Sequence, residues 1–169
     1  PLLISWNTPY KIAPFDEILD DHFSEAVERA MEYELQEIQE ISENSDPPTF
    51  ENTIHALLKS GNLLERVLSV FYTLVSADSN TQREKLMTEF SPKLSSHSSK
   101  ITSNEKLFNR IQKLFEKIDS LNLLPEEQRL LEKIHQDYVR AGAALNDQSK
   151  ERIKDIKKQP VSYTHLTLP

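Results

Sequence analysis

The chain has 169 residues, of which 37% are hydrophobic and 28% are charged, and its net charge at pH 7 is −7. The acidic balance argues against a nucleic-acid partner, because phosphate binding needs a basic face, and no apolar run approaches the ~20 residues of a membrane span. The chain has no cysteine, which excludes disulfides, thiolate catalysis and Cys-ligated zinc. Its two glycines argue against Gly-rich phosphate loops and for long helices.

Residues 1–18 are predicted to form an extended arm that lies on the surface of the protein. They contain three prolines and show no sustained hydrophobic period. The aromatic side chains of this segment are the expected anchors of the arm: Trp6, Tyr10 and Phe15.

A long helix is predicted after the arm, ending at the sequence NSDPP, residues 44–48. Asp20 or Asp21 is its expected N-cap. Its apolar residues recur at steps of three and four, which places them on one helix face. They are Phe23, Ala26, Val27, Ala30, Met31, Leu35, Ile38 and Ile41.

The next helix is predicted to start at Thr49, with Glu51 placing negative charge near its N-terminus. Its expected buried side chains are Phe50, Ile54, Leu57 and Leu58. The sequence KSG at 59–61 predicts a kink or a short break. Beyond it, residues 63–75 are apolar around more than half of the helix circumference, so this segment is predicted to be the buried core element.

The rest of the chain also favours helices. A break is predicted at SADSN, residues 76–80, followed by a weaker helix that Pro92 is expected to kink. Asn104 is the expected cap of the next helix, and Pro125 is expected in the first turn of another. The expected inward residues of these three helices are Leu86, Phe90, Leu94 and Ile101, then Leu107, Ile111, Leu114, Phe115 and Ile118, and then Leu130, Leu131, Ile134, Tyr138 and Val139.

A last helix is predicted to begin at Asn146 or Asp147, with only Ile153 and Ile156 facing inward before Pro160. No segment alternates long enough to form a strand, and no internal repeat is visible. The predicted fold is therefore all-α, a multi-helix array over residues 1–159.

The final residues, VSYTHLTLP at 161–169, differ in composition from the charged helical sequence before them. Their codons resemble the transposase-end adapter of short-read sequencing libraries. Residues 160–169 are therefore interpreted as a non-native tail, and the chain as a fragment whose last helix is cut. The alternative is a genuine edge strand or linker.

Four histidines outside the tail could carry chemistry: His22, His55, His97 and His135. None belongs to an HExxH pair, which places two zinc ligands one helical turn apart. Glu132 and His135 form the half-motif of a di-iron bundle. Such a site needs a second copy and two more glutamates, so a pair on the helix surface is the favoured interpretation.

Two further polar groups are candidate sites. The sequence HSS at 97–99 is interpreted as a polar helix face. The acidic group Asp16, Glu17, Asp20 and Asp21 lacks the spacing of a calcium loop, so a solvated helix start is favoured. The sequence therefore predicts no catalytic, cofactor-binding or metal-binding residue in this chain.

A series of segments nevertheless resembles a known family. In order, they are NTPYKIAPFDEI, DHFSEAVERAM, PTFENTIHALLKSGNLLERVLSVFYTLVSADSN, EFSPKLSSH, LFNRIQKLF and RLLEKIHQDYVRAGAAL. Their order and spacing resemble the N-terminal region of the thimet-oligopeptidase-like zinc metallopeptidases, family M3, over residues 1 to about 158. The most specific pieces are TFENTIxALxxSGxLLxRV at 49–67 and HxDxVRAGAxL at 135–145. The segments FENTI, SAD and VRAGAAL favour the peptidyl-dipeptidase branch over the oligopeptidase A branch.

The resemblance implies a helical fold split by a deep channel, with this chain forming part of one wall. It implies oligopeptide substrates, release of C-terminal dipeptides, and a missing C-terminal catalytic half as partner. The zinc ligands would come from an HExxH helix and a later glutamate beyond this chain, so zinc is expected only in the full-length parent. A cytoplasmic location is expected, without a nucleic-acid or membrane partner.

A second hypothesis is a free-standing helical module that binds a partner helix or peptide in a groove. The reading frame beyond Lys158 distinguishes the two hypotheses. An HExxH motif several hundred codons downstream supports the peptidase, and a prompt stop codon supports the module.

Overall fold

The computed structural model describes residues 1–145 and Arg152, and in this part of the chain every regular element is a helix. The main elements are α1 (His22–Glu43), the π-helical segment η2 (Phe50–His55), α2 (Ala56–Lys59), α3 (Asn62–Ala77), α4 (Thr81–Thr102), α5 (Glu105–Phe115) and α6 (Pro125–Ala141). Two short 3-10 turns are η1 (Pro9–Lys11) and η3 (Ile118–Ser120). The predicted all-α fold is confirmed.

Three predictions fall on residues that the structure does not describe. They are the last helix with Asn146 or Asp147 as its cap and Ile153 and Ile156 inward, the end of the helical region at residue 159, and the tail at 160–169. None of the described helices is both long enough and apolar enough to cross a membrane.

Side-chain caps mark where η2 and α5 begin. Thr49 Oγ1 accepts a hydrogen bond from the Asn52 N–H at 3.0 Å, and Asn52 Oδ1 accepts one from the Thr49 N–H at 2.8 Å, so the two residues satisfy each other's free donors. Asn104 Oδ1 accepts from the Leu107 N–H at 3.0 Å. The predicted starts at Thr49 and Asn104 are therefore confirmed.

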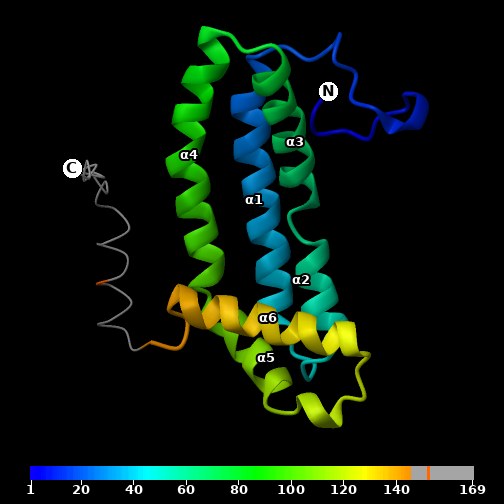
Figure 1. Ribbon diagram of the computed structural model, residues 1–169, viewed down its shortest axis with the longest axis vertical. Coiled ribbons are helices and arrows are strands. Elements are labelled where there is room, and N and C mark those ends of the chain that lie inside the picture. Colours follow the sequence, from blue (N-terminus) through cyan, green and yellow to red (C-terminus); the bar gives the residue numbers. More distant parts are fainter. Residues whose placement is uncertain (146–151, 153–169) are drawn as a thin grey trace, which may run out of the picture.

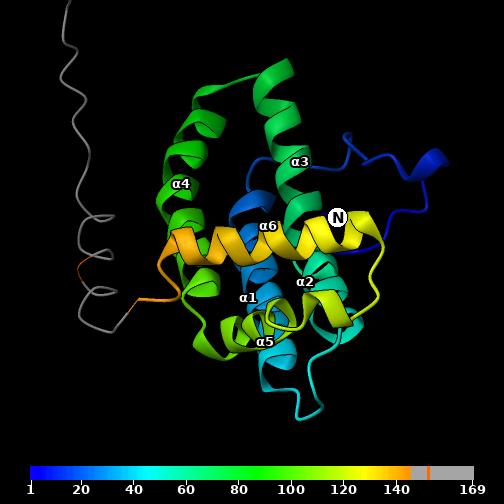
Figure 2. The ribbon, with the colours of Figure 1, turned by 60° about the horizontal axis from the view of Figure 1, so that its bottom comes forward.

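The helices are arranged around α1. Figure 1 shows α1 standing between α3 and α4, while α6 crosses the long helices at one end and α5 lies beside it. Figure 2 shows the same crossing from below. Helix α1 packs against α3 and α4 along one part of its length and against η2 and α5 along another. It is therefore shared by two hydrophobic clusters.

The first cluster joins α1, α3 and α4 through three phenylalanines. The Phe71 ring on α3 lies 5.1 Å from the Phe23 ring on α1 and 5.1 Å from the Phe90 ring on α4, both in edge-to-face geometry. All three side chains are buried, and edge-to-face pairs add to the stabilisation that burial provides. The predicted inward positions of Phe71 and Phe90 are confirmed.

The second cluster joins the other end of α1 to η2, α5 and α6. Its buried residues are Ile38, Ile41, Ile54, Leu107, Phe108, Ile111, Leu114, Leu131, Tyr138 and Ala143. Helix α6 ends here, because Gly142 takes a left-handed conformation, with φ 100°, and the Ala143 N–H bonds back to the Tyr138 carbonyl at 3.0 Å.

The prediction that residues 63–75 form the buried core element holds for one face of α3 only. In α3 only Leu64, Val67, Val70 and Phe71 are buried, and the second apolar face of the segment is partly exposed. The centre of the fold is α1, which has neighbours on several sides. Most of its exposed residues are charged or polar, so composition alone did not reveal its central position.

Two smaller predictions also need correction. Leu58 and Val139 were expected to be buried, but they are 50% and 40% exposed. Both residues lie at the edge of their helix's apolar stripe. Helix α4 is continuous from Thr81 to Thr102 and includes Pro92, so the expected kink at this residue stays a prediction. The predicted break at KSG is confirmed between α2 and α3.

The arm is held by different residues from those predicted. Tyr10 is 96% exposed and Phe15 is 42% exposed, so neither is an anchor. Buried aliphatic side chains, Leu2, Ala13 and Ile18, attach the arm to the first cluster instead. Trp6 is the one predicted anchor that has a partner, because the Arg66 guanidinium lies 5.0 Å from the centre of its ring.

Candidate functional site

The four histidines lie in separate environments. His22 Nδ1 accepts a hydrogen bond from the Leu19 N–H, and His55 pairs with Glu51 one turn away on the same helix. His97 and His135 contact other helices, as described below. Among residues 1–145 and Arg152, no three His, Cys, Asp or Glu residues lie close enough to hold a metal ion. These residues therefore do not fit a zinc or di-iron centre.

Glu132 and His135 do not act as a pair. Glu132 accepts from Arg129 at 3.0 Å on the same helix face, which is exposed, as predicted. The His135 ring instead turns toward α5, where it stacks on Phe115 at 3.9 Å and donates from Nε2 to Gln112 Oε1 at 2.6 Å. Burial lowers the pKa of His135, which favours the neutral, stacking form. The surface interpretation is therefore wrong for His135.

The most enclosed polar contact joins α1 to α4. Glu34 Oε2 lies 2.7 Å from His97 Nε2, and the two side chains are only 17% and 7% exposed. His97 occupies the same helix face as Phe90 and Ile101, so the prediction that HSS at 97–99 is a polar face is wrong for this residue. A buried carboxylate and imidazole satisfy each other and fix how the two helices face one another.

Two other elements lie near Glu34, the α2–α3 connection and helix α6. A side chain at Gly61, between α2 and α3, would place its Cβ 2.5 Å from Glu34 Oε1. Gly61 also has φ +74°, a conformation that suits glycine. Tyr138 on α6 brings a buried hydroxyl without a hydrogen-bond partner among the described residues. Burial, and to a smaller extent the nearby charge of Glu34, raises the pKa of this hydroxyl. Glu34, His97, Gly61 and Tyr138 together are called the Glu34 junction.

The chemistry of the Glu34 junction is structural. A carboxylate and a histidine can form a general-base pair, but such a pair must reach a substrate. His97 is 6% exposed and Tyr138 is 6% exposed, so an oligopeptide has no access to either group. The junction therefore connects helices and does not form an active site.

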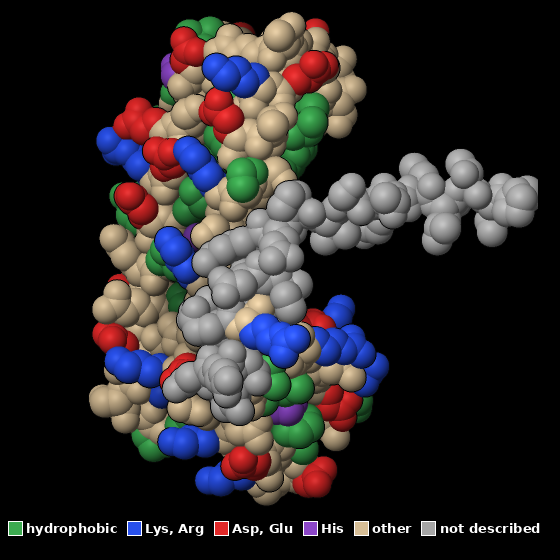
Figure 3. Space-filling view, turned by 90° about the vertical axis from the view of Figure 1, so that its left-hand side faces the viewer, with side chains coloured by type: hydrophobic (Ala, Val, Ile, Leu, Met, Phe, Trp, Pro, Cys, Tyr) green, Lys and Arg blue, Asp and Glu red, His purple; other side chains and the backbone are tan. Residues whose placement is uncertain are grey.

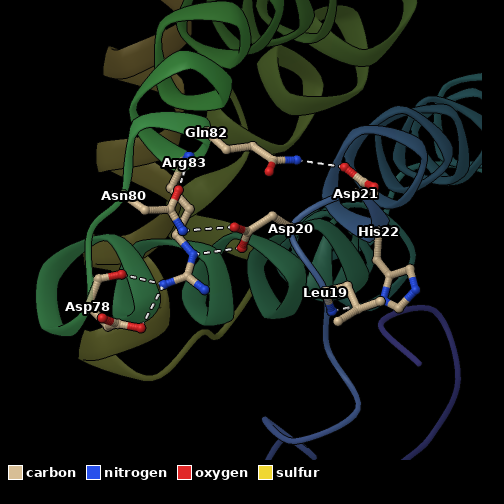
Figure 4. Close-up of polar contacts among 8 residues, drawn as sticks. All are labelled: Leu19, Asp20, Asp21, His22, Asp78, Asn80, Gln82 and Arg83. Carbon is tan, nitrogen blue, oxygen red and sulfur yellow. Dashed lines mark hydrogen bonds and ion pairs between the residues drawn. The ribbon is translucent and has the colours of Figure 1, made fainter.

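The acidic group at the start of α1 forms a clamp on α4 (Figure 4). Arg83 Nε donates to Asp20 Oδ1 at 2.7 Å, Asn80 Nδ2 donates to Asp20 Oδ2 at 2.8 Å, and Gln82 Nε2 donates to Asp21 Oδ1 at 2.6 Å. Asp20 is only 16% exposed. The predicted solvated helix start is thus wrong for Asp20, and neither aspartate caps α1 through its side chain.

We expect Asp20→Asn to destabilise the protein at pH 7 by roughly 1–2 kcal/mol, and this difference to shrink in acid. Burial raises the pKa of Asp20. This effect is outweighed by the hydrogen bonds from Asn80 and Arg83 and by the charge of Arg83, so the pKa is lowered overall. A lowered folded-state pKa gives stability that is present above the unfolded pKa, about 3.9, and is lost as the pH falls below it. Urea denaturation between pH 7 and pH 3 measures the effect.

The exposed residue Asp16 supplies the matched control for this series. Asp16→Asn should change the free energy of unfolding by less than about 0.5 kcal/mol at each pH. A difference between wild type and Asp20→Asn that stays constant down to pH 3 would contradict the ionised clamp.

A buried arginine, missed in the sequence, holds the connection between α1 and η2. Arg110 on α5 is 7% exposed. Its Nη1 donates to the backbone carbonyls of Asn44 at 2.7 Å and Asp46 at 3.0 Å, and its Nη2 donates to Asn52 Oδ1 at 2.9 Å. The guanidinium therefore fixes the loop that leads into the most specific sequence pattern of the chain, which begins at Thr49.

A shallow trough with a volume of about 540 Å³ lies on the surface of α3. It is lined by Ser69, Tyr72, Thr73, Ser76 and Ala77. These side chains can donate and accept hydrogen bonds, but the trough contains no carboxylate or imidazole for acid–base catalysis. On the face shown in Figure 3, basic and acidic side chains are interspersed over α4, so this face has no uniform charge.

We expect the purified chain to bind zinc no better than incidental surface histidines do, and to show no peptidase activity. The reason is that, among residues 1–145 and Arg152, no three histidines or carboxylates lie close enough to hold a metal ion, and His55 and His97 are already paired. Zinc titration by calorimetry, with metal analysis before and after chelation, measures the binding. A stoichiometric, chelator-sensitive zinc ion of sub-micromolar affinity would contradict this expectation.

Comparison with curated proteins finds relatives among peptidases. The chain is 36% identical over 164 residues to dipeptidyl carboxypeptidase of Escherichia coli K12 and 38% identical over 159 residues to that of Salmonella typhimurium LT2. These matches cover 97% and 94% of this chain but 24% and 23% of the relatives. Oligopeptidase A of Escherichia coli K12 is 22% identical over 149 residues, covering 88% of this chain and 22% of the relative.

The chain thus spans about a quarter of the length of the curated relatives it matches. No family model matches the chain. The similarity extends through the helices described above, including the segments that carry the capped start of η2, the Glu34 junction and the Arg110 loop.

Proposed function

We propose that the chain is the N-terminal, non-catalytic helical wall of a zinc metallopeptidase that releases dipeptides from the C-termini of oligopeptides. The observation that carries the proposal is the identity of 36–38% with two dipeptidyl carboxypeptidases over almost the whole chain. Similarity at that level over about 160 aligned residues supports a common fold and a common role for this part of the parent protein.

The same comparison supports the choice of branch. Identity with oligopeptidase A is 22%, compared with 36% for dipeptidyl carboxypeptidase of the same organism. We therefore favour dipeptide release over general oligopeptide cleavage. The cytoplasmic location expected from the resemblance stays a prediction.

The geometry of this chain fits a supporting role. Its enclosed polar groups join helices to one another: Glu34 with His97, Asp20 with Arg83, and Arg110 with the 44–52 loop. The described residues do not supply a zinc site, so we place the metal and the groups that activate water in the remaining three quarters of the parent. A wall of fixed helices would then select short, flexible peptides by shape.

The test begins with the reading frame beyond Lys158. We expect an HExxH motif several hundred codons downstream, and we expect the full-length protein to release C-terminal dipeptides from oligopeptides with a blocked N-terminus. Mass spectrometry of the products identifies the released fragments, and a metal chelator should abolish the release. N-terminally blocked peptides distinguish this activity from aminopeptidase cleavage.

A stop codon soon after Lys158 would overturn the proposal and favour the free-standing binding module. Cleavage at internal bonds without dipeptide release would retain the peptidase but assign it to the oligopeptidase A branch.

A further inference from the structure

The N-terminal arm carries four exposed large apolar side chains between residues 4 and 15, a segment here called the tip of the arm, although Ala13 within it is buried. Between residues 1 and 15 the only charged side chain is Lys11, whereas 28% of the whole chain is charged. Ile4, Tyr10, Ile12 and Phe15 are 65%, 96%, 56% and 42% exposed. Interface cores are depleted of charge and enriched in aromatic residues, so this composition indicates a surface that is covered in the complete protein.

The arm extends away from the helices, with η1 at its outer end (Figure 1 and Figure 2). Its base is fixed on both sides of the tip. Leu2 is buried before the tip and Ile18 is buried after it, and Arg66 donates to the Leu2 carbonyl at 3.1 Å while covering the Trp6 ring. The arm is therefore a loop held at both ends.

The outer end of the loop has an unusual backbone. Tyr10 and Lys11 have φ angles of 57° and 56°, a left-handed conformation uncommon for residues other than glycine. The Lys11 N–H bonds to the Thr8 carbonyl at 3.0 Å, and Thr8 Oγ1 donates to the Ile12 carbonyl. This local network turns the Tyr10 ring outward. Sparsely populated backbone conformations occur where a binding surface needs them.

We propose that the tip of the arm, with Tyr10 as its central contact, docks into an apolar recess on the part of the parent polypeptide that follows this chain. The proposal rests on the proposed function, because the relatives are about four times as long as this chain. About three quarters of the parent is therefore available to cover the tip. A single large aromatic side chain in a desolvated pocket is the usual centre of such a contact.

Two other occupants fit less well. A lipid surface would require basic residues beside the apolar ones, but the tip has only Lys11 and the chain carries a net charge of −7. A second copy of the chain would have to offer an apolar recess. The trough on α3 is lined by three hydroxyl side chains in addition to Tyr72 and Ala77, which does not match Ile4, Ile12 and Phe15.

The experiment uses the full-length parent with Tyr10→p-benzoylphenylalanine, a photoreactive aromatic residue. After irradiation, peptide mapping should find crosslinks within one molecule, from position 10 to a single region of the parent beyond Lys158. The matched control is Tyr33→p-benzoylphenylalanine, since Tyr33 is 53% exposed on the regular helix α1. Denaturation in urea before irradiation should abolish the crosslink from position 10.

Each other outcome overturns the proposal. A crosslink yield at position 10 no higher than at position 33 means that the tip is uncovered, and a covalent dimer means that a second copy covers it. Peptidase activity of the wild-type parent is measured in the same preparation. An active parent without the crosslink contradicts only the docking proposal, and an inactive parent with the crosslink contradicts only the proposed function.

Discussion

Replacing Phe71 with alanine should lower the free energy of unfolding by roughly 3–5 kcal/mol, the range for deleting a large buried aromatic side chain. The Phe71 ring is fully buried and makes edge-to-face contacts with Phe23 and Phe90. Its removal therefore leaves a cavity where α1, α3 and α4 meet. Because native domains are stable by only about 5–15 kcal/mol, the variant should show a large loss in urea denaturation at pH 7.

The neighbouring residue provides the control for this experiment. Tyr72→Ala removes an aromatic side chain from the same helix, but Tyr72 is 42% exposed. We expect its effect to be under about 1 kcal/mol. Equal losses for Phe71→Ala and Tyr72→Ala would show that Phe71 is not the centre of the first cluster.

The starts of several helices could be predicted from the sequence because short-range chemistry determines them. Thr49 and Asn104 cap their helices with their own side chains, and Pro125 occupies the first turn of α6. Each signal lies within four residues of the helix that it starts. The all-α fold could be predicted for the same reason, since the hydrophobic period is local.

The positions of the helices relative to one another could not be predicted, because they depend on contacts between distant residues. Helix α3 is more apolar than α1. Helix α1 nevertheless lies at the centre, because its narrower apolar stripe packs against more of the other helices. The arm shows the same limit. Its aromatic residues were the natural anchors by size, but Leu2 and Ile18 fill the available space instead.

The contact between Glu34 and His97 could have been predicted from the sequence. His97 follows Phe90 by seven residues and precedes Ile101 by four, and Glu34 interrupts the apolar stripe of α1. A polar residue within an apolar stripe requires a hydrogen-bond partner. Because α1 and α4 each carry one such residue, the pattern favours a contact between the two. Their contact at 2.7 Å is the result. The same reasoning applies to Arg110, between Leu107 and Leu114 on α5.

The second large effect is expected for Arg110→Met, which should lower the free energy of unfolding by roughly 2–4 kcal/mol. Methionine replaces most of the side-chain volume but donates no hydrogen bond. The carbonyls of Asn44 and Asp46 then lose the partner that holds them against α5. Urea denaturation gives the loss, and hydrogen exchange at residues 44–52 should show faster exchange in the variant.

Two further variants separate the hydrogen bonds from packing and charge. Lys113→Met removes an exposed cation from the same helix and should change stability by less than about 0.5 kcal/mol. Arg110→Lys retains the charge, but an ammonium group cannot reproduce the planar fork that reaches Asn44, Asp46 and Asn52 together. We therefore expect an intermediate loss for Arg110→Lys. A loss for Arg110→Met as small as that for Lys113→Met would mean that packing, and not the guanidinium, holds the loop between α1 and η2.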